Sequence, residues 1–376
     1  MTEPHNSQGS DNDVELEHES ENVLTFDDTD DQDMVELQDD SVQGFFAHGE
    51  PVYSVAMHPN NDVLVASGGG DDKAYLWRRD TGETCYTWDG FTDSVTTVRF
   101  NLDGTMVAAG SMDGKVGVWY TADGKSVATL DGPSEVTWLD WHSRGNILLA
   151  GSADGTMWMW ALPSGQCMNV FSGHPEPVTC GQFTPNGRQI VTGSDDGSLN
   201  IWDPKTATTI HRLNSHDARF HAETITAMDV SSDSTIVLTG STDHTARLVH
   251  LQNGQMVGAL GEHTDSVETV GFSHTMSLAA TGSVDGKINI WDVQTLRLRQ
   301  TVHHDEAVTK LLWHHESPLL TTTSADRTVK VWDARTGHCE KTWVGHHDAI
   351  LDFAMTKDGH SVVTGSDDGC CLVFTV

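Results

Sequence analysis

The sequence predicts an all-β protein in which eight copies of one short unit close into a single ring, the architecture of a β-propeller. The main observation is a repeated turn, Gly-Ser-x-Asp-Gly, whose Asp is followed six residues later by an aromatic residue or Val; the clearest copy is GSDDGSLNIWD, Gly193 to Asp203. Successive copies are 41 or 42 residues apart, except for a spacing of 47 between Asp196 and Asp243. A fixed period of this length is typical of repeat folds. The repeat Asp residues are Asp71, Asp113, Asp154, Asp196, Asp243, Asp285, Asp326 and Asp368.

Each unit is predicted to form four short strands separated by turns. In the fourth unit, the tight-turn dipeptides Asn186-Gly187 and Asp196-Gly197 separate short apolar runs. The 35 glycines of the chain suit such a turn-rich fold. Four antiparallel strands with short links make one propeller blade. We expect the strands of this unit at residues 178–183, 189–192, 199–202 and 208–213.

The first 41 residues differ from the rest of the chain, because they include fifteen acidic residues and no Lys or Arg. Such a segment buries too little apolar surface to offset the entropy of ordering it. We therefore predict that residues 1–41 form a disordered acidic tail. It serves either as a solubilising tail or as a flexible anionic arm that captures a basic ligand, and the sequence leaves both open.

The two ends of the repeat array predict how the ring closes. Only two residues follow Phe374, so the eighth unit lacks its fourth strand. Residues 42–46 look like a fourth strand without the three that should precede it. Placed beside the last unit, they complete the eighth blade and remove two sheet edges that would otherwise promote aggregation. We expect one propeller domain over residues 42–376, closed by its N-terminal strand.

A second marker lies four residues before the first Val or Ile of each unit's first strand. The second unit has Phe91 there, the third is one residue shorter with Gly132-Pro133, and in the fifth either His216 or His221 could fill the position. The other five units carry a His: His48, His174, His263, His304 and His346.

The His near the start of these units and the Trp-Asp pair at their end, as at Trp202-Asp203, resemble the WD-repeat family. The resemblance covers residues 42–376. It implies that the repeat Asp is structural: the Asp accepts a hydrogen bond from the His, which is linked through a Ser or Thr to the Trp indole. In the fourth unit the four residues would be His174, Ser194, Asp196 and Trp202. Nor do the remaining histidines or the glycine-rich segment match a metal, nucleotide or hydrolase motif. We predict a protein that is not an enzyme and has no metal site or cofactor.

Charge restricts the class of partner. The chain has 55 acidic and 21 basic residues and a formal net charge of −34, which disfavours nucleic acid and anionic membranes and favours basic partners. No apolar run is long enough to cross a membrane, and no signal peptide is evident. The six cysteines lack a CxxC pair and are interpreted as reduced thiols. We expect a monomer in the cytoplasm, with the nucleus as an alternative location.

A second register of acidic residues is the main candidate for function. Two residues before the first Val or Ile of the first strand, seven of the eight units carry Asp or Glu, and the third carries Glu one place later. Such loops open on one face of a propeller, so the acids should surround the channel mouth together with three neighbouring acids. We predict that this ring binds a basic protein segment through Glu50, Asp93, Glu135, Glu176, Asp195, Glu223, Asp265, Glu268, Glu306, Asp348 and Asp367.

A simpler interpretation is that an acid caps a turn well at this position. It accounts for several of the acids, but not for acids in all eight units with so few Lys or Arg in the same loops. Like charges repel one another, and a cationic ligand would relieve that repulsion. In the third unit, Trp138 and Trp158 are further candidates for contact with a partner, although Trp at such positions more often belongs to the core.

Longer stretches narrow the resemblance. Residues 68–77, 137–160 and 349–364 resemble the family of angio-associated migratory cell protein, which is similar to ribosome-assembly chaperones of the Sqt type. The resemblance implies a chaperone that captures a newly made, basic ribosomal protein of the large subunit. Two alternatives stay open. VWDAR, Val331 to Arg335, resembles the Trp-Asp-x-Arg box of substrate receptors for cullin-ring ubiquitin ligases, and the family name suggests a signalling or cell-migration scaffold.

Overall fold

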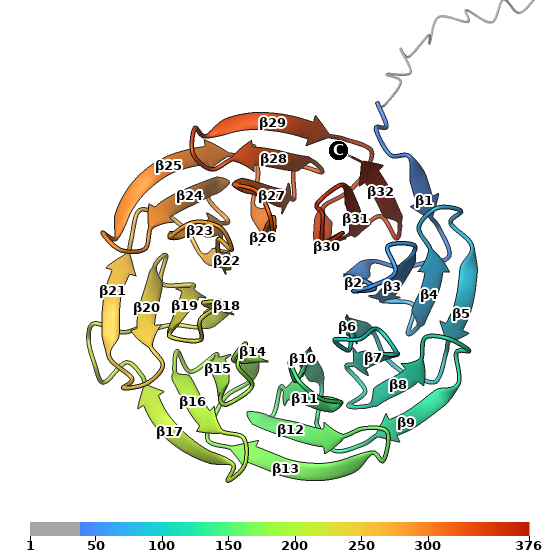
Figure 1. Cartoon of the computed structure of the whole chain (residues 1–376), viewed down its shortest axis with the longest axis horizontal. Helices are drawn as coiled ribbons and strands as arrows, with labels where there is room; N and C mark the ends of the chain where they lie inside the picture. Colours follow the sequence, from blue (N-terminus) through green and yellow to red (C-terminus); the bar gives the residue numbers. More distant parts are fainter. Residues whose placement is uncertain (1–37, 376) are drawn as a thin grey trace, which may run out of the picture. The chain divides into compact units, whose positions relative to one another are not determined.

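The computed structural model describes residues 38–375, which form 32 β-strands in eight four-stranded antiparallel sheets. The sheets are the blades of a closed ring (Figure 1), so the predicted eight-bladed propeller is confirmed. The part of the predicted tail at residues 1–37 lies outside the described residues. Within residues 38–375, no helix is long and apolar enough to cross a membrane.

Each blade contributes one strand to each of four layers. In order from blade 1 to blade 8, the inner strands are β2 (Val52–Met57), β6 (Val95–Phe100), β10 (Val136–Trp141), β14 (Val178–Phe183), β18 (Ile225–Val230), β22 (Val267–Phe272), β26 (Val308–Trp313) and β30 (Ile350–Met355). In the same order, the second strands are β3 (Leu64–Gly69), β7 (Met106–Ser111), β11 (Ile147–Ser152), β15 (Ile190–Ser194), β19 (Ile236–Ser241), β23 (Leu278–Ser283), β27 (Leu319–Ser324) and β31 (Ser361–Ser366).

The two outer layers complete the blades. The third strands are β4 (Ala74–Arg78), β8 (Val116–Tyr120), β12 (Thr156–Ala161), β16 (Leu199–Asp203), β20 (Ala246–His250), β24 (Lys287–Asp292), β28 (Val329–Asp333) and β32 (Cys371–Thr375). The outer strands are β5 (Thr84–Trp88), β9 (Ser126–Leu130), β13 (Gln166–Ser172), β17 (Thr208–Leu213), β21 (Met256–Leu260), β25 (Arg297–His303), β29 (His338–Trp343) and β1 (Gln43–Phe45).

The hydrophobic core lies between neighbouring blades. Strands of the second layer are buried almost completely, as in β7, whereas an outer strand such as β5 is only partly buried. One core cluster joins Leu76 of blade 1 to Val98 of blade 2, and the other clusters join neighbouring blades in the same way. Because each blade buries its apolar faces against two neighbours, the ring fixes where every loop emerges.

A β-bulge lies at the start of every inner strand. In all eight blades the pairing of the inner with the second strand shifts register after the first residue, as between Val178 and Cys180 in blade 4. A bulge bends the strand and redirects its end. The bulges therefore help to set the direction of the loops that carry the predicted acids.

The ring closes through the N-terminal strand, as the sequence predicts. β1 pairs with β32, with Gln43 opposite Val373 and Phe45 opposite Cys371. Phe45 also stacks on Trp77 of blade 1, with ring centroids 4.7 Å apart and an interplanar angle of 4°. The strand thus completes blade 8 and packs on blade 1.

Two further contacts support the closure. Asp40, which the sequence assigned to the tail, exchanges two hydrogen bonds with Val344 in the link between blades 7 and 8. Asp352 of β30 accepts the Val55 amide of blade 1 at 2.9 Å and forms an ion pair with Lys310 of blade 7. Blades 7, 8 and 1 are therefore tied together by polar contacts as well as by apolar packing.

Candidate protein-binding face

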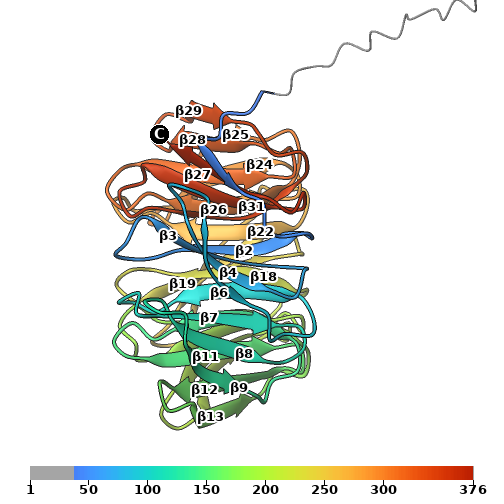
Figure 2. The ribbon, with the colours of Figure 1, turned by 90° about the vertical axis from the view of Figure 1, so that its right-hand side faces the viewer.

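The loops of the blades lie on two opposite faces of the ring, because successive strands of a blade are antiparallel (Figure 2). We call top face the side with the leading loops, which enter the inner strands, and with the turns between second and third strands. In blade 4 these are residues 173–177 and 195–198. The bottom face holds the other loops. The repeat Asp residues, which we call turn Asp residues, and the eleven predicted ring acids all belong to the top face.

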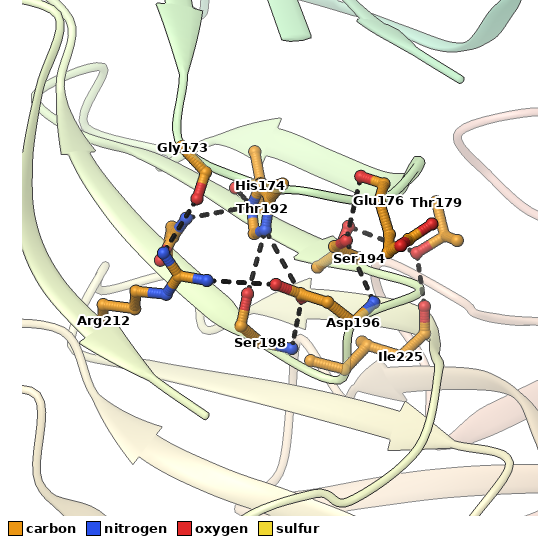
Figure 3. Close-up of polar contacts among 12 residues, drawn as sticks. Gly173, His174, Glu176, Thr179, Thr192, Ser194, Asp196, Ser198, Arg212 and Ile225 are labelled. Atoms are coloured by element: carbon orange, nitrogen blue, oxygen red, sulfur yellow. Dashed lines mark hydrogen bonds and ion pairs between the residues drawn. The ribbon is translucent and has the colours of Figure 1, made fainter. Parts of the chain in front are cut away.

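A chain of hydrogen bonds joins the leading loop of blade 4 to its third strand (Figure 3). Trp202 Nε1 donates to Thr192 Oγ1 at 2.9 Å, and His174 Nε2 lies 2.8 Å from the same hydroxyl. His174 Nδ1 lies 2.9 Å from Ser198 Oγ and 3.6 Å from a carboxylate oxygen of Asp196. Buried polar groups need such partners, so these contacts support a structural role for Asp196.

The linking hydroxyl is a correction to the sequence prediction, which assigned it to Ser194. Thr192 fills this role, and Ser194 lies at the end of β15 beside the turn. The Ser194 hydroxyl instead donates to the Glu176 carbonyl at 3.2 Å and accepts the Asp196 amide at 3.2 Å. Side chains two residues apart on a strand share one side, so the sequence pattern does not separate the two hydroxyls.

Five other blades contain an equivalent His–hydroxyl–Asp network. In blade 5 the His is His221 and not His216: its Nδ1 lies 2.8 Å from Asp243 and its Nε2 2.9 Å from Thr239. Burial alone would raise the pKa of Asp243, but the hydrogen bond and charge of His221 lower that pKa to about 2. The corresponding pairs elsewhere are His48–Asp71, His263–Asp285, His304–Asp326 and His346–Asp368.

Blades 2 and 3 lack this network and replace it with aromatic packing. In blade 2 the linking position is Ala109 and the His position is Phe91. Trp88 stacks on Trp119 at 4.4 Å, and a Cβ added at Gly117 would lie 2.0 Å from the Trp119 ring. In blade 2 apolar residues replace both the His and the linking hydroxyl. Neither polar group is therefore left buried without a partner.

The two tryptophans singled out in blade 3 differ in burial. Trp138 is 8% exposed, and its Nε1 donates to the Val178 carbonyl of blade 4 at 3.1 Å. Trp158 is half-buried, with its Nε1 donating to Thr156 Oγ1 at 3.0 Å. Trp138 is therefore part of the contact between blades, and Trp158 packs near the surface beside Trp160.

The ring acids are available to a ligand. Ten of the eleven side chains are exposed, and Glu268 is half-buried. Within residues 38–375, none of the eleven carboxylates lies within ion-pair distance of Lys, Arg or His. Four cations of the top face pair with turn Asp residues instead: Lys115–Asp113, Arg212–Asp196, Lys287–Asp285 and Lys330–Asp326.

Two recurring backbone contacts hold the leading loops. In six blades the Ser that ends the second strand donates to the carbonyl of the ring acid, as Ser194 does to Glu176 and Ser366 to Asp348. In addition, the amide before each turn Asp donates to the carbonyl one residue beyond the acid, such as Pro177 in blade 4. In blade 3 that carbonyl belongs to Glu135, which confirms that Glu135 is displaced by one place.

The sequence did not reveal a set of carboxylates on the inner strands. Asp140 and Asp229 accept the amides of Phe183 and Phe272 in the next blades, both at 2.7 Å. They line a pocket of about 350 Å³ together with Gln182 and residues of the bottom-face loops. Burial raises the pKa of each carboxyl to about 6. The amides would otherwise be unpaired at the inner edge of the sheet, so these acids have a structural role.

Four of the paired histidines, His304, His314, His315 and His346, contact other protein groups. Within the described residues, no group of three or more His, Cys, Asp or Glu could hold a metal ion. His304 and His346 belong to the turn networks, and His314 Nε2 lies 2.8 Å from Thr321 Oγ1. His274 and His315 stack at 4.3 Å between neighbouring blades.

The Trp-Asp-x-Arg segment contains a local ion pair. Arg335 Nε and Nη2 donate to the two carboxylate oxygens of Asp333 at 3.0 and 2.6 Å. A similar pair joins Arg299 to Asp292 in the preceding blade. Pairing of this kind is therefore a feature of the blades, and it gives the ligase-receptor alternative no added support.

Fold and networks together define a WD-repeat β-propeller. Models of the WD domain (G-beta repeat) match residues 40–78 and 82–120, and a model of the nucleolar protein 10-like N-terminal propeller matches residues 120–376. The chain belongs to the family of angio-associated migratory cell protein. It is 38% identical to the Homo sapiens member over 357 residues, which cover 91% of this chain and 81% of that protein.

Two further relatives concern ribosome assembly. The chain is 26% identical to ribosome assembly protein SQT1 of Saccharomyces cerevisiae over 408 residues, covering 97% of this chain and 93% of that protein. It also superimposes on Sqt1 of Chaetomium thermophilum bound to the N-terminus of the ribosomal protein L10, with a TM-score of 0.84 and 27% identity over 90% of this chain and 100% of that chain.

Proposed function

We propose that this protein is a non-enzymatic chaperone that captures a newly made, basic ribosomal protein of the large subunit on the ring acids of its top face. The segment captured is the basic N-terminal part of that protein. The chaperone keeps its client soluble until the client joins the assembling subunit. We place this activity in the cytoplasm or the nucleus and expect the chaperone to act as a monomer.

One observation carries the proposal. Eleven carboxylates lie on one face, ten of them exposed, and no Lys, Arg or His within the described residues pairs with any of them. An uncompensated group of like charges raises the energy of the free protein, and a cationic ligand lowers it. The relative from Chaetomium thermophilum, with the same fold, is bound to the N-terminus of a ribosomal protein.

Capture needs no covalent step. Lys and Arg side chains of the client would form charge-assisted hydrogen bonds with the ring acids, and an Arg can use two bonds to one carboxylate. The net charge of −34 would accelerate encounter with a basic client. Salt weakens contacts between exposed charges, so affinity should fall as ionic strength rises.

The binding site can be tested by charge reversal with a matched control. The triple variant Glu176→Lys, Glu223→Lys, Asp265→Lys should bind an N-terminal peptide of ribosomal protein L10 at least about 100-fold more weakly than the unaltered protein, because attraction becomes repulsion. Fluorescence anisotropy with a labelled peptide measures the affinity. Unchanged affinity would rule out the top face as the binding site.

The control makes an equal change of charge on the bottom face. Asp62, Glu83 and Glu316 are exposed there and form no ion pair within the described residues. Their reversal to Lys should alter affinity by less than about fivefold, through the long-range field alone. If both variants lose affinity equally, binding depends on net charge and not on the top face.

The cellular role needs a separate experiment. Affinity purification of the tagged protein from cells should enrich one free large-subunit ribosomal protein without mature ribosomes. The top-face triple variant should lose this protein, and the bottom-face variant should retain it. Recovery of a ligase adaptor that depends on Arg335 would instead support the substrate-receptor alternative.

A further inference from the structure

The leading loops that carry the ring acids pack against turns of the preceding blade, and these turns are of two kinds. Seven of the ring acids lie two residues before the first Val or Ile of an inner strand, and four of these seven are Glu. Each of the four lies beside a turn whose residue after the turn Asp is Gly, with φ between 70° and 79°. A Cβ added at these glycines would lie 2.8 to 3.3 Å from the carbonyl oxygen of the acid, so the leading loop approaches the turn closely. The Gly–Glu pairs are Gly155–Glu176, Gly197–Glu223, Gly286–Glu306 and Gly369–Glu50.

The other three acids in this register are Asp, and in the preceding turns the residue after the turn Asp is not glycine. The turn residues are Asp72, His244 and Arg327, with φ between 60° and 68°, which precede Asp93, Asp265 and Asp348 respectively. Each of the three ring carboxylates accepts its own following backbone amide at 2.8 Å.

The carboxylates of the two classes therefore differ in availability. Within the described residues, no hydrogen bond engages the carboxylates of Glu50, Glu135, Glu176 or Glu306, and Glu223 accepts only the Thr242 hydroxyl at 3.2 Å. A carboxylate without a backbone bond can accept both arms of a guanidinium. Ordering a Glu side chain costs more rotamer entropy than ordering an Asp, but two charge-assisted bonds outweigh that difference.

The cations of the top face give an independent indication of where a basic segment can lie. Within two residues of the turn Asp, blades 1, 2, 6 and 7 hold one Lys or Arg each. The turn of blade 8 holds none, but blade 8 lies between blades 7 and 1, whose turns each hold a Lys or Arg. The turns of blades 3, 4 and 5, at residues 153–156, 195–198 and 242–245, also hold none. Near them on the top face, Arg212 is paired with Asp196 and Arg219 with Asp217. Lys73 and Arg327, in the turns of blades 1 and 7, form no ion pair among the described residues. These three consecutive blades carry Glu135, Glu176 and Glu223, with Asp195 between them.

We propose that a basic segment follows the arc of blades 3 to 5, with Glu135, Glu176 and Glu223 as its main cation-binding residues. The aspartates Asp93, Asp265 and Asp348 chiefly hold their own loops. This inference rests on the proposed function and adds the path of the client and the residues that determine affinity.

Two variants that remove the same amount of charge test the path. One is Glu135→Gln, Glu176→Gln, Glu223→Gln; the other is Asp93→Asn, Asp265→Asn, Asp348→Asn, in which each Asn oxygen can still accept the loop amide. Binding of a labelled N-terminal peptide of ribosomal protein L10 is measured at several salt concentrations, and thermal unfolding checks each fold. The glutamine variant should bind about 10- to 100-fold more weakly, and the asparagine variant less than about threefold.

The other outcomes separate failure of the path from failure of the proposed function. Equal losses would overturn the proposed path while leaving capture by the ring as a whole intact. A loss of affinity confined to the asparagine variant would also overturn the path. Because affinity is compared below the unfolding transition, lower stability of that variant would not account for its lost affinity. If neither variant loses affinity, both the path and the proposed function of the top face fail.

Discussion

Two sets of acids lie on the top face of each blade and have opposite environments. In blade 5 the turn Asp, Asp243, bonds to His221, whose hydrogen bond and charge overcome the effect of burial and hold the pKa of Asp243 at about 2. The ring acid of the same blade, Glu223, is exposed and pairs with no cation among the described residues. The Ser241 hydroxyl joins them, since it accepts the Asp243 amide and donates to the Glu223 carbonyl. The difference shows that partners, and not residue type, separate structural acids from those available to a ligand.

Acid should destabilise the protein chiefly through the turn Asp residues. The folded-state pKa values of Asp243 and Asp368 are about 2, below the ordinary 3.8, so their stabilisation is complete above about pH 4 and is lost as pH falls toward 2. Asp196 and Asp326 shift in the same direction. We expect the free energy of unfolding to fall by several kcal/mol, about 1–2 for each such Asp once solvent screening is allowed for, in urea titrations across this range. A flat profile between pH 4 and 2 would contradict the structural role.

A single turn Asp can be compared with the ring acid beside it. Asp243→Ala removes the partner of His221 Nδ1 and should lower the free energy of unfolding by about 2–4 kcal/mol. Glu223→Ala, at an exposed position in the same blade, should change it by less than about 0.5 kcal/mol. Chemical denaturation of both variants provides the measurement. Equal losses would remove the distinction between the two sets.

A third kind of acid lies where the ring closes. Among the described residues, Lys310→Met would leave the buried Asp352 carboxylate with only the Val55 amide as a partner, so stability should fall by about 1–3 kcal/mol in chemical denaturation. Lys357→Met, at an exposed position with no ion pair among the described residues, is the matched control and should be neutral. A neutral Lys310→Met variant would show that apolar packing alone holds blades 7, 8 and 1 together.

The smallest effect is expected at the pocket acids. The pKa of Asp140 is raised to about 6, so its ionised form is disfavoured in the folded state, and that cost disappears as pH falls from about 6 to 4. Asp140→Asn should raise the free energy of unfolding at pH 7, by less than about 1 kcal/mol because the pocket is open to solvent, and should have no effect at pH 4. A destabilised variant at pH 7 would show that Asp140 gains more from ionic contacts than it loses by burial.

Most of the fold could be predicted, because the repeat period repeats the same physical requirements eight times. In blade 4 three strands begin where the sequence predicts, and β15 begins one residue later. The closing strand also followed from counting strands at the two ends of the array. The choice between His216 and His221 depended on how an inserted loop folds, and the choice between Thr192 and Ser194 on two hydroxyls that share one side of a strand.

Sequence spacing predicted that the ring acids share one face, but it did not predict the contacts made by the carboxylates of the inner strands. Asp140 bonds to Phe183 and Asp352 to Val55, contacts between different blades that depend on the angle between them. No local pattern encodes that angle. The two classes of ring acid were missed for a related reason: the glycine that packs against the loop of Glu223, Gly197, belongs to the preceding blade.

Electrostatic capture on the top face is tested most directly by exchanging the charges of both partners. The variant Glu176→Lys, Glu223→Lys, Asp265→Lys is paired with an N-terminal peptide of ribosomal protein L10 whose Lys and Arg residues are replaced by Glu. We predict that each change alone abolishes binding and that together they restore affinity to within about tenfold of the original pair. Binding of the original peptide by the reversed protein, or no restoration in the reversed pair while the bottom-face control binds normally, would contradict capture by the ring acids.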